Sequence, residues 1–480
     1  MSAPDEDEAR GERLPDAALP EGILGWLELS SARRLGLFLA VLAAAAGATA
    51  LVPEQPGLDG EARRALFVLL TATGLWLTEA IPAFAVGILV IALQVLLLGR
   101  PAAEGGDWER HVLVLGHPLV WLFFGGLVLA AGMNRTGIDR WLAAHALARF
   151  ARRPRALVVA VAAIAFVLSM IMSNTATTAM MLALVAPLLQ GRAVSDRFAA
   201  TLVLAVPVGA NLGGMGSLVG TPPNAIAAGT LADRGEVVLS FARWFTVGLP
   251  PALVLAGLLV GVLLLRLRGA PPGSVATPEP PGAADRAPHW AILVVAGTLV
   301  ATLGLWLTQD LHGLPTPVVA VVPVVLLTAT GVLDVDAFRR LSYDVLFLLA
   351  GGLALGQAIH ETGLAAWLVG RVDLAGLPPL AFAMLAGAFA VVLSNVMSNT
   401  AAANVLVPLV LTVPAAGGTD AVLSVALCAS AAMALPVATP PNALAHATGR
   451  VRARDFLLLG IVTALVAPPL TALWVHWLAI

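Results

Sequence analysis

Two short runs of hydroxyl and amide side chains interrupt the most apolar parts of this chain. Each run reads Ser-Asn-Thr, at residues 173–175 and 398–400, and each follows another serine, Ser169 or Ser394, by one helical turn. Hydroxyl and amide oxygens, together with backbone carbonyls, suit a hard monovalent cation such as Na⁺. An amide can also coordinate a cation through its oxygen while its nitrogen donates to a carboxylate. The pattern therefore predicts two related sites where a cation and an anion bind together.

A second paired motif, Thr-Pro-Pro-Asn, lies in the middle of an apolar stretch in each half of the chain, at residues 221–224 and 439–442. Two consecutive prolines cannot lie inside a regular helix, so each helix must break there. Non-helical backbone at membrane depth is tolerated only where it is buried in protein or lines a cavity. A helix that restarts after such a break, or after the tip of a hairpin, directs free N–H groups at an anion. Paired interrupted segments of this kind predict a transport site.

These four elements contain no carboxylate, histidine or arginine. A bound sodium ion would then supply the positive charge that a cationic side chain otherwise provides for an anion, so we expect binding of the two to be coupled. Enzymatic chemistry has little support, because the sequence has no HExxH, no GxSxG and no pair of aspartates at membrane depth. We therefore expect neither an enzyme nor any cofactor besides the coupling ion.

The composition is that of a protein with many membrane crossings. Of the 480 residues, 59% are hydrophobic and 12% charged, and the mean hydropathy is +0.91, which leaves too few charges for a water-facing surface. Apolar stretches long enough to cross a bilayer recur from Leu35 onward. The single cysteine, Cys428, excludes an internal disulfide, and we interpret it as a buried apolar residue.

The two halves of the chain repeat one unit. Gly-Leu-Trp-Leu-Thr at residues 74–78 recurs at 304–308, and a Gly-Gly pair at 125–126 recurs at 351–352. The Ser-Asn-Thr and Thr-Pro-Pro-Asn motifs recur in the same order, while the offset between the halves falls from 230 to 218 residues. We expect the Gly-Gly pairs to allow close helix packing.

Arginine placement predicts that the repeats are inverted. Five arginines lie between residues 140 and 155, whereas the matching stretch 364–379 contains Arg371 alone. Short Arg-rich loops stay in the cytoplasm, so these equivalent loops face opposite sides. We predict an all-α integral membrane protein with about 11 transmembrane helices and two re-entrant helical hairpins, with its N-terminus in the cytoplasm and its C-terminus outside. Under this topology 20 of the 27 basic residues, all arginines, lie on the inner side.

The paired Ser-Asn-Thr runs and Pro-Pro-Asn breaks resemble those of the divalent anion–sodium symporter family, over nearly the whole chain after its N-terminal tail. The resemblance implies sodium-coupled symport of dicarboxylates such as succinate, fumarate or malate across the plasma membrane. It also implies a homodimer with an elevator mechanism, in which scaffold helices hold a moving transport domain. The implied partners are a small dianion, sodium ions, the lipid bilayer and a second copy of the chain, with no nucleic acid.

The same resemblance implies the residues of the site. The ligands of the first sodium would be Ser169, Ser173, Asn174 and the carbonyl of Gly220, and those of the second would be Ser394, the carbonyl of Met397, Asn399 and the carbonyl of Ala438. The substrate would contact Asn174, Thr175, Thr221, Ser398, Asn399, Thr400, Thr439 and Pro440. Family members often have threonine where Ser394 stands, so we expect an altered affinity there with the site retained.

The resemblance also divides the chain into parts. The expected parts are a disordered cytoplasmic tail (1–34), scaffold helices (35–153), a transport-domain half with the first hairpin and break (154–268), a cytoplasmic linker (269–288), scaffold helices (289–377) and a second transport-domain half (378–480).

Several alternatives stay open at this point. The chain could be a sodium-independent exchanger of dicarboxylates or citrate, a sulfate carrier or, more remotely, a membrane-embedded enzyme. The sequence does not rank succinate, fumarate, malate, citrate or sulfate as the substrate, nor does it give the sodium stoichiometry. Two ionisable residues near the membrane have open roles: we expect a structural ion pair for Glu79 and hydrogen-bonded packing for His446.

Overall fold

The computed structural model describes residues 31–53, 55–99, 107–190, 193, 196–267, 287–371, 376–413 and 417–479. Most of the predicted tail, residues 269–286 of the predicted linker and the terminal Ile480 lie outside the described residues. Within these ranges every regular element is a helix. Seven of the described helices are long and apolar enough to cross a membrane, and several shorter helices of 10–17 residues are also apolar. The all-helical membrane class is confirmed, while the number of crossings stays a prediction.

The helices follow the two halves of the chain. The first half forms α1 (Ser31–Leu51), α2 (Gly60–Thr78), α3 (Ala83–Leu97), α4 (Glu109–Leu113), α5 (Pro118–Thr136), α6 (Ile138–Ala148), α7 (Pro154–Ser169), α8 (Asn174–Val185), α9 (Arg197–Met215), α10 (Pro222–Asp233) and α11 (Phe241–Arg266). The second half forms α12 (His289–Leu307), α13 (Gln309–His312), α14 (Thr316–Val319), α15 (Val321–Ala329), α16 (Val335–Arg339), α17 (Tyr343–Glu361), α18 (Leu364–Val369), α19 (Pro379–Ser394), α20 (Asn399–Val410), α21 (Gly418–Ala431), α22 (Pro440–Ala447) and α23 (Ala453–Leu478). Short 3-10 helices cover Val114–Gly116 and Ala186–Leu189.

The repeat predicted from the motifs is present in the order of these elements. Each half contains a helical hairpin (α7–α8 or α19–α20), then a broken helix (α9–α10 or α21–α22), then a long helix of 26 residues (α11 or α23). Both hairpins turn at a Ser-Asn-Thr run, and both broken helices restart at the first proline of Pro-Pro-Asn. The first segments end earlier, at Met215 and Ala431, and the two prolines suit the first turn of the next segment because that turn needs no donors from them.

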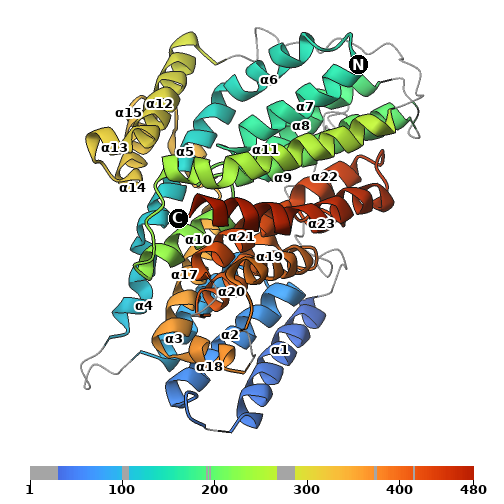
Figure 1. Cartoon of the computed structure of the whole chain (residues 1–480). Helices are drawn as coiled ribbons and strands as arrows, with labels where there is room; N and C mark the ends of the chain where they lie inside the picture. The colour runs from blue at the N-terminus through green and yellow to red at the C-terminus, as the bar shows by residue number, and fades with distance from the viewer. Residues whose placement is uncertain are drawn as a thin grey trace, which may run out of the picture.

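The equivalent helices α11 and α23 run antiparallel, which makes the repeats inverted. They pack against each other and lie side by side in the middle of the molecule (Figure 1). Arg266, at the C-terminal end of α11, pairs with Asp455 in the first turn of α23. At the opposite end, the indole N–H of Trp474 in α23 donates to the carbonyl of Thr246 in α11 over 2.9 Å.

Outside the hairpins and breaks, each half contributes one helix that packs against helices of the other half; we call these two the exchanged helices. The helix α5 packs against α12, α14 and α15 of the second half, whereas α17 packs against α2 and α3 of the first. In Figure 1 the yellow helices α12–α15 and the blue helices α1–α3 accordingly lie at different ends of the molecule.

The predicted Gly-Gly pairs lie on these exchanged helices. A Cβ at Gly125 of α5 would lie 2.2 Å from the carbonyl oxygen of Ala320, and one at Gly351 of α17 would lie 2.2 Å from Cα of Gly87. Only glycine allows such approaches. The expected close packing is confirmed.

Ion pairs between distant segments connect residues that the predicted topology places on the same side of the membrane. These pairs are Arg135–Asp334 and Arg266–Asp455 on the predicted inner side, and Arg110–Glu361 and His117–Asp233 on the predicted outer side. Each of these contacts thus joins two residues of the same predicted side, which agrees with the predicted topology. Which of the two sides faces the cytoplasm stays a prediction.

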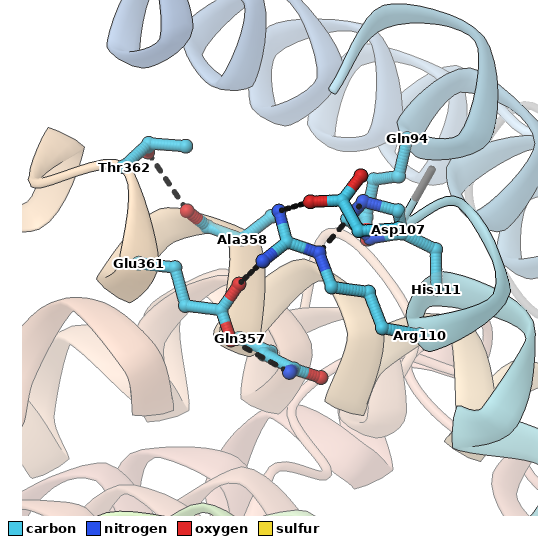
Figure 2. A network of polar contacts seen from close by, with 8 residues as sticks. All are labelled: Gln94, Asp107, Arg110, His111, Gln357, Ala358, Glu361 and Thr362. Atoms are coloured by element: carbon cyan, nitrogen blue, oxygen red, sulfur yellow. Dashed lines mark hydrogen bonds and ion pairs between the residues drawn. The ribbon is translucent and has the colours of Figure 1, made fainter. Parts of the chain in front are cut away.

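A polar network on the predicted outer side joins α3 and α4 to the end of α17 (Figure 2). At its centre, Arg110 pairs with Glu361 over 3.3 Å and with Asp107 over 3.4 Å. The neighbouring His111 ring lies 3.2 Å from the side-chain oxygen of Gln94. The network thus holds the segment that precedes α5 against the end of α17, and so it stabilises the contact of the exchanged helices. It lies apart from the four predicted binding elements.

Candidate functional site

The tip of the first hairpin is organised by three polar side chains. The Ser169 hydroxyl, at the end of α7, donates to the side-chain oxygen of Asn174 over 2.6 Å. Ser173 caps α8, because its hydroxyl oxygen accepts from the backbone N–H of Ala176 over 3.2 Å. This is the capping role expected of a serine before a helix. The tip therefore places a hydroxyl oxygen and an amide oxygen side by side at the positive end of a helix.

The second hairpin repeats this arrangement bond for bond. The Ser394 hydroxyl donates to the side-chain oxygen of Asn399 over 3.0 Å, and Ser398 accepts from the N–H of Ala401 over 3.2 Å. A repeated sequence motif thus forms a repeated local structure in two parts of the chain that are 225 residues apart.

The asparagine of each Pro-Pro-Asn motif braces its own helix break. The side-chain nitrogen of Asn224 donates to the carbonyls of Gly214 (2.9 Å) and Ser217 (2.7 Å). The nitrogen of Asn442 makes the equivalent bonds to Met433 (3.2 Å) and Leu435 (3.0 Å). Carbonyls that a broken helix leaves without partners would be costly when buried. These two amides supply partners, so the breaks are stable irregular segments.

In the first half, the hairpin tip lies directly against the break. A Cβ at Gly214 would lie 2.6 Å from the side-chain oxygen of Asn174, and a Cβ at Gly220 would lie 2.5 Å from the Gly214 carbonyl. The Ser217 hydroxyl also donates to the carbonyl of Met170 in the hairpin turn. Glycine at these positions therefore lets Asn174, which is bonded to Ser169, lie against Gly214, and Gly214 in turn lies against Gly220.

In the second half, an asparagine of the hairpin turn holds the break. The side-chain oxygen of Asn395 accepts from the backbone N–H of Ala434 over 2.8 Å, and its nitrogen donates to the carbonyl of Val391 over 2.8 Å. The predicted carbonyl ligands Met397 and Ala438 are buried in the same turn and the same break. Both halves thus bring hairpin tip and break together, through different side chains.

The two halves also contact each other at the site. The helix α22 packs against α8 and α9, and α10 packs against α20. Asn211 of α9 donates to the Thr439 hydroxyl over 3.1 Å and to the side-chain oxygen of Asn442 over 3.2 Å. Thr439 accepts in turn from the N–H of Asn442 over 3.3 Å, while Thr221 makes no equivalent cap bond. Among the described residues, no hydrogen bond joins one hairpin tip to the other.

The two tips differ in exposure. Ser173 and Thr175 of the first hairpin are exposed, whereas Ser398 and Thr400 of the second are buried, each at 8% exposure. Asn174 and Asn399 are both half-buried. Among the predicted substrate contacts, Thr221 and Thr439 are buried and Pro440 is half-buried. The Ser-Asn-Thr run of the first hairpin is therefore the more exposed of the two.

The donor set fits a hard monovalent cation. Each tip offers one hydroxyl and one amide oxygen in contact, and the side-chain oxygen of Asn224, buried at the first break, has no hydrogen-bond partner. In the parts of the chain that the structure describes, no group of three or more His, Cys, Asp or Glu side chains could hold a metal ion. Neutral oxygen ligands do not suit zinc or a transition metal.

Several residues of this region could not be recognised from the motifs alone. Each long helix crosses its neighbouring break at a glycine: a Cβ at Gly248 would lie 2.2 Å from the Met215 carbonyl, and one at Gly460 would lie 2.1 Å from Cα of Ala434. The Trp244 indole N–H also donates to the Met215 carbonyl over 3.0 Å. A further internal match, Ala-Arg-x-Phe at residues 242–245 and 453–456, is the signal that could have located these crossings.

Two residues outside the site agree with their predicted roles. The His446 ring lies 2.8 Å from the Val451 carbonyl and packs edge-on against Phe456, as expected for a packing histidine. Cys428 is fully buried and unpaired.

An all-helical membrane protein with two inverted repeats, paired hairpin tips and paired helix breaks belongs to the class of secondary transporters. Its family model is the citrate transporter model, CitMHS, which matches residues 68–426. This match covers most of the chain, so the protein belongs to the citrate transporter family.

Curated relatives and a solved structure agree with this class. The sodium-dependent dicarboxylate transporter SdcS of Staphylococcus aureus strain USA300 is 27% identical over 440 residues, which are 84% of this chain and 83% of that protein. The SdcS protein of strain bovine RF122 / ET3-1 is also 27% identical, over 467 residues and 89% of this chain. The Alcanivorax borkumensis YdaH transporter shares the fold with a TM-score of 0.50 at 14% identity, over 82% of this chain and 97% of the other.

Proposed function

We propose that this protein is a sodium-coupled symporter of dicarboxylates in the plasma membrane. The observation that carries the proposal is the identical hydroxyl–amide pair in both hairpins, Ser169–Asn174 and Ser394–Asn399, in a site without a charged side chain. Bound cations would supply positive charge for a dianion there, in addition to the N–H groups of the helix starts. The sodium-dependent dicarboxylate transport named for the SdcS relatives supports the same reading.

In this proposal each pair of oxygens takes part in one sodium site. Ser169, Ser173, Asn174 and the Gly220 carbonyl serve the first ion. Ser394, Asn399 and the carbonyls of Met397 and Ala438 serve the second. The serine hydroxyl now donates to the amide oxygen, and it must turn its hydrogen away for both oxygens to face a cation.

The substrate carboxylates are proposed to lie beside these ions. The proposed contacts are Asn174, Thr175, Thr221, Ser398, Asn399, Thr400, Thr439 and Pro440. The helices α8 and α20 begin among these residues, and the N–H groups of their first turns favour an anion. The helices α10 and α22 also begin there, but each starts with two prolines, and the next N–H, of Asn224 or Asn442, already donates to Thr221 or Thr439. The proposed order of events is sodium first and dianion second.

We further propose that two copies of the chain transport by an elevator motion. The hairpins, broken helices and long helices (residues 154–268 and 378–480) would move against scaffold helices (35–153 and 289–377). The exchange of α5 and α17 between the halves supports this division, because it makes a frame that holds both repeats. Exposure of the first hairpin tip supports a state open toward the cytoplasm, provided that the predicted topology holds.

The test is uptake of labelled succinate into proteoliposomes with and without an inward sodium gradient. We expect uptake only with sodium, inhibited by unlabelled fumarate and malate. Uptake that is as fast when choline replaces sodium, and that requires dicarboxylate inside the proteoliposomes, would contradict symport and identify an exchanger. Stronger inhibition by citrate or sulfate than by fumarate would replace the proposed substrate with that anion.

A further inference from the structure

A basic cavity lies at one end of the long helices, away from the hairpin tips. It has a volume of about 920 Å³ and is lined by eight residues, namely Arg197, Ala200, Arg266, Gly449, Arg450, Arg452, Arg454 and Asp455. Five arginines and one aspartate give the lining a net charge of +4. The cavity therefore suits a ligand with concentrated negative charge, and it is made from residues that the proposed transport site does not use.

Some of the charged side chains of this cavity already have partners among the described residues, and others do not. Asp455 pairs with Arg266 and also accepts from the backbone N–H of Arg452 over 2.9 Å. The Arg450 guanidinium donates to the carbonyls of Leu189 (3.3 Å) and Ala193 (3.5 Å). These contacts build the wall and leave only one carboxylate on it.

Three further arginines complete the lining. Arg197, Arg452 and Arg454 are exposed, and no carboxylate of the described residues forms an ion pair with them. Their guanidinium groups can bind phosphate oxygens in a bidentate manner.

The cavity lies at the ends of two candidate membrane-spanning helices. It is formed where α11 ends and α23 begins, and both helices are long and apolar enough to cross a bilayer. Next to it, α23 carries an exposed apolar face made of Leu457, Leu458, Ile461 and Leu465, and Leu265 of α11 is also exposed. These apolar side chains do not line the cavity, but they follow its arginines along the same two helices, so a ligand with a long apolar part could extend from the arginines onto them.

We propose that this cavity binds an anionic phospholipid, with its phosphate among the arginines and its acyl chains along α11 and α23. Basic pockets between transmembrane helices are suited to such headgroups. The apolar face favours a lipid over a free phosphate ion, because a small ion would use the arginines alone. The lipid would hold the end of α11 to the start of α23, two helices that cross the two breaks at Gly248 and Gly460. This inference does not depend on the transported substrate.

The test is native mass spectrometry of the purified full-length protein, titrated with phosphatidylglycerol, phosphatidylcholine or inorganic phosphate. The variant is Arg452→Gln/Arg454→Gln, which leaves the Arg266–Asp455 pair in place. Its matched control is Arg152→Gln/Arg153→Gln, which removes two exposed arginines on the same predicted side, outside the cavity. We expect the wild type and the control to prefer phosphatidylglycerol, and the cavity variant to bind it about tenfold more weakly.

Three results would overturn the proposal. They are equal binding of both lipids by the wild type, unchanged phosphatidylglycerol binding by the cavity variant, and phosphate binding without any preference for the anionic lipid. If the wild type gains phosphatidylglycerol preference only after deletion of residues 2–30, the arginines bind the acidic N-terminal segment and not a lipid. If the double variant does not fold, Arg452→Gln and Arg454→Gln as single variants give the same comparison.

Discussion

At the scale of single residues, the site depends on amide groups with two distinct tasks. Asn174 and Asn399 present their oxygens to a serine hydroxyl at the hairpin tips, where a cation could replace the hydrogen bond. Asn224 and Asn442 instead use their nitrogens to hold the carbonyls of the breaks. The first pair can therefore change partners during transport, while the second pair keeps the backbone in place.

This division of tasks predicts the effects of four substitutions. Ser169→Ala should mainly raise the sodium concentration for half-maximal transport, because Ser169 lies one turn below the tip and contacts Asn174. Thr400→Ala should mainly weaken substrate binding, by about 1–3 kcal/mol if a charge-assisted hydrogen bond is lost. Asn174→Ala and Asn399→Ala should damage both dependences. The measurement is transport rate over a grid of sodium and succinate concentrations.

The outcome of this grid can contradict the roles without contradicting the family. If Ser169→Ala changes only the succinate concentration for half-maximal transport, Ser169 is not a ligand of the sodium site. Unchanged sodium dependence in both asparagine variants would do the same for the proposed bridging amides. Ser173→Ala is less informative, since Ser173 also caps α8 and its loss costs about 1 kcal/mol of helix stability.

At the scale of elements, the broken helices keep their shape because a long helix crosses each break at van der Waals distance. The crossings at Gly248 and Gly460 place helix backbone against break backbone, with no room for a side chain. This arrangement fixes where each break lies relative to its hairpin tip, so the long helices position the site without contributing a ligand.

Gly248→Ala and Gly460→Ala should therefore impair transport by displacing a break. Each added methyl group would lie about 2 Å from backbone atoms, and overpacking of this kind costs about 1–3 kcal/mol. We expect lower melting temperatures and raised half-saturation concentrations for sodium and succinate together. The matched control is Gly257→Ala in α11, where a Cβ would meet nothing within 4 Å. Equal losses at Gly257 and Gly248 would contradict the role of the crossing, because the change to alanine favours the helix at both positions and only Gly248 lies against a break.

At the scale of the whole molecule, the two repeats are equal in sequence motif but unequal in exposure. The first tip exposes Ser173 and Thr175, while the second buries Ser398 and Thr400. Alternating access in inverted-repeat transporters opens the site to one side at a time, so we expect the exposures of the two tips to exchange in the opposite state.

Accessibility of single cysteines tests this asymmetry together with the topology. On a Cys428→Ala background, Thr175→Cys should react with an impermeant thiol reagent from the cytoplasmic side, and Thr400→Cys should react far more slowly. Sodium and succinate together should protect Thr175→Cys. The labelling rates are measured in right-side-out and in inside-out vesicles. Reaction of Thr175→Cys only from the outside would reverse the predicted orientation, and equal rates at both positions would contradict the asymmetry.

The sequence alone predicted the two hairpin tips and the two helix breaks. A serine before a free helix start caps it, so the caps Ser173 and Ser398 follow from local chemistry. The proline pairs by themselves do not fix the breaks at residues 221–224 and 439–442, because Pro250–Pro251 and Pro468–Pro469 lie inside the continuous helices α11 and α23. Because each element occurs twice, the repeat was visible, and the bias of arginines toward one set of loops indicated its inversion. The antiparallel contact of α11 and α23 agrees with that inference.

Only the tertiary structure decided how the repeats fit together. The bond from Asn211 to Thr439 joins residues 228 positions apart, and the exchange of α5 and α17 joins helices of different halves. The first contact leaves no repeated pattern, because Asn211 has no counterpart in the second half, and the repeated Gly-Gly pairs of α5 and α17 predicted close packing without naming the partner helices. The unequal exposure of the two tips has the same origin: local chemistry forms two equal tips, but the packing of one conformation admits access to only one of them.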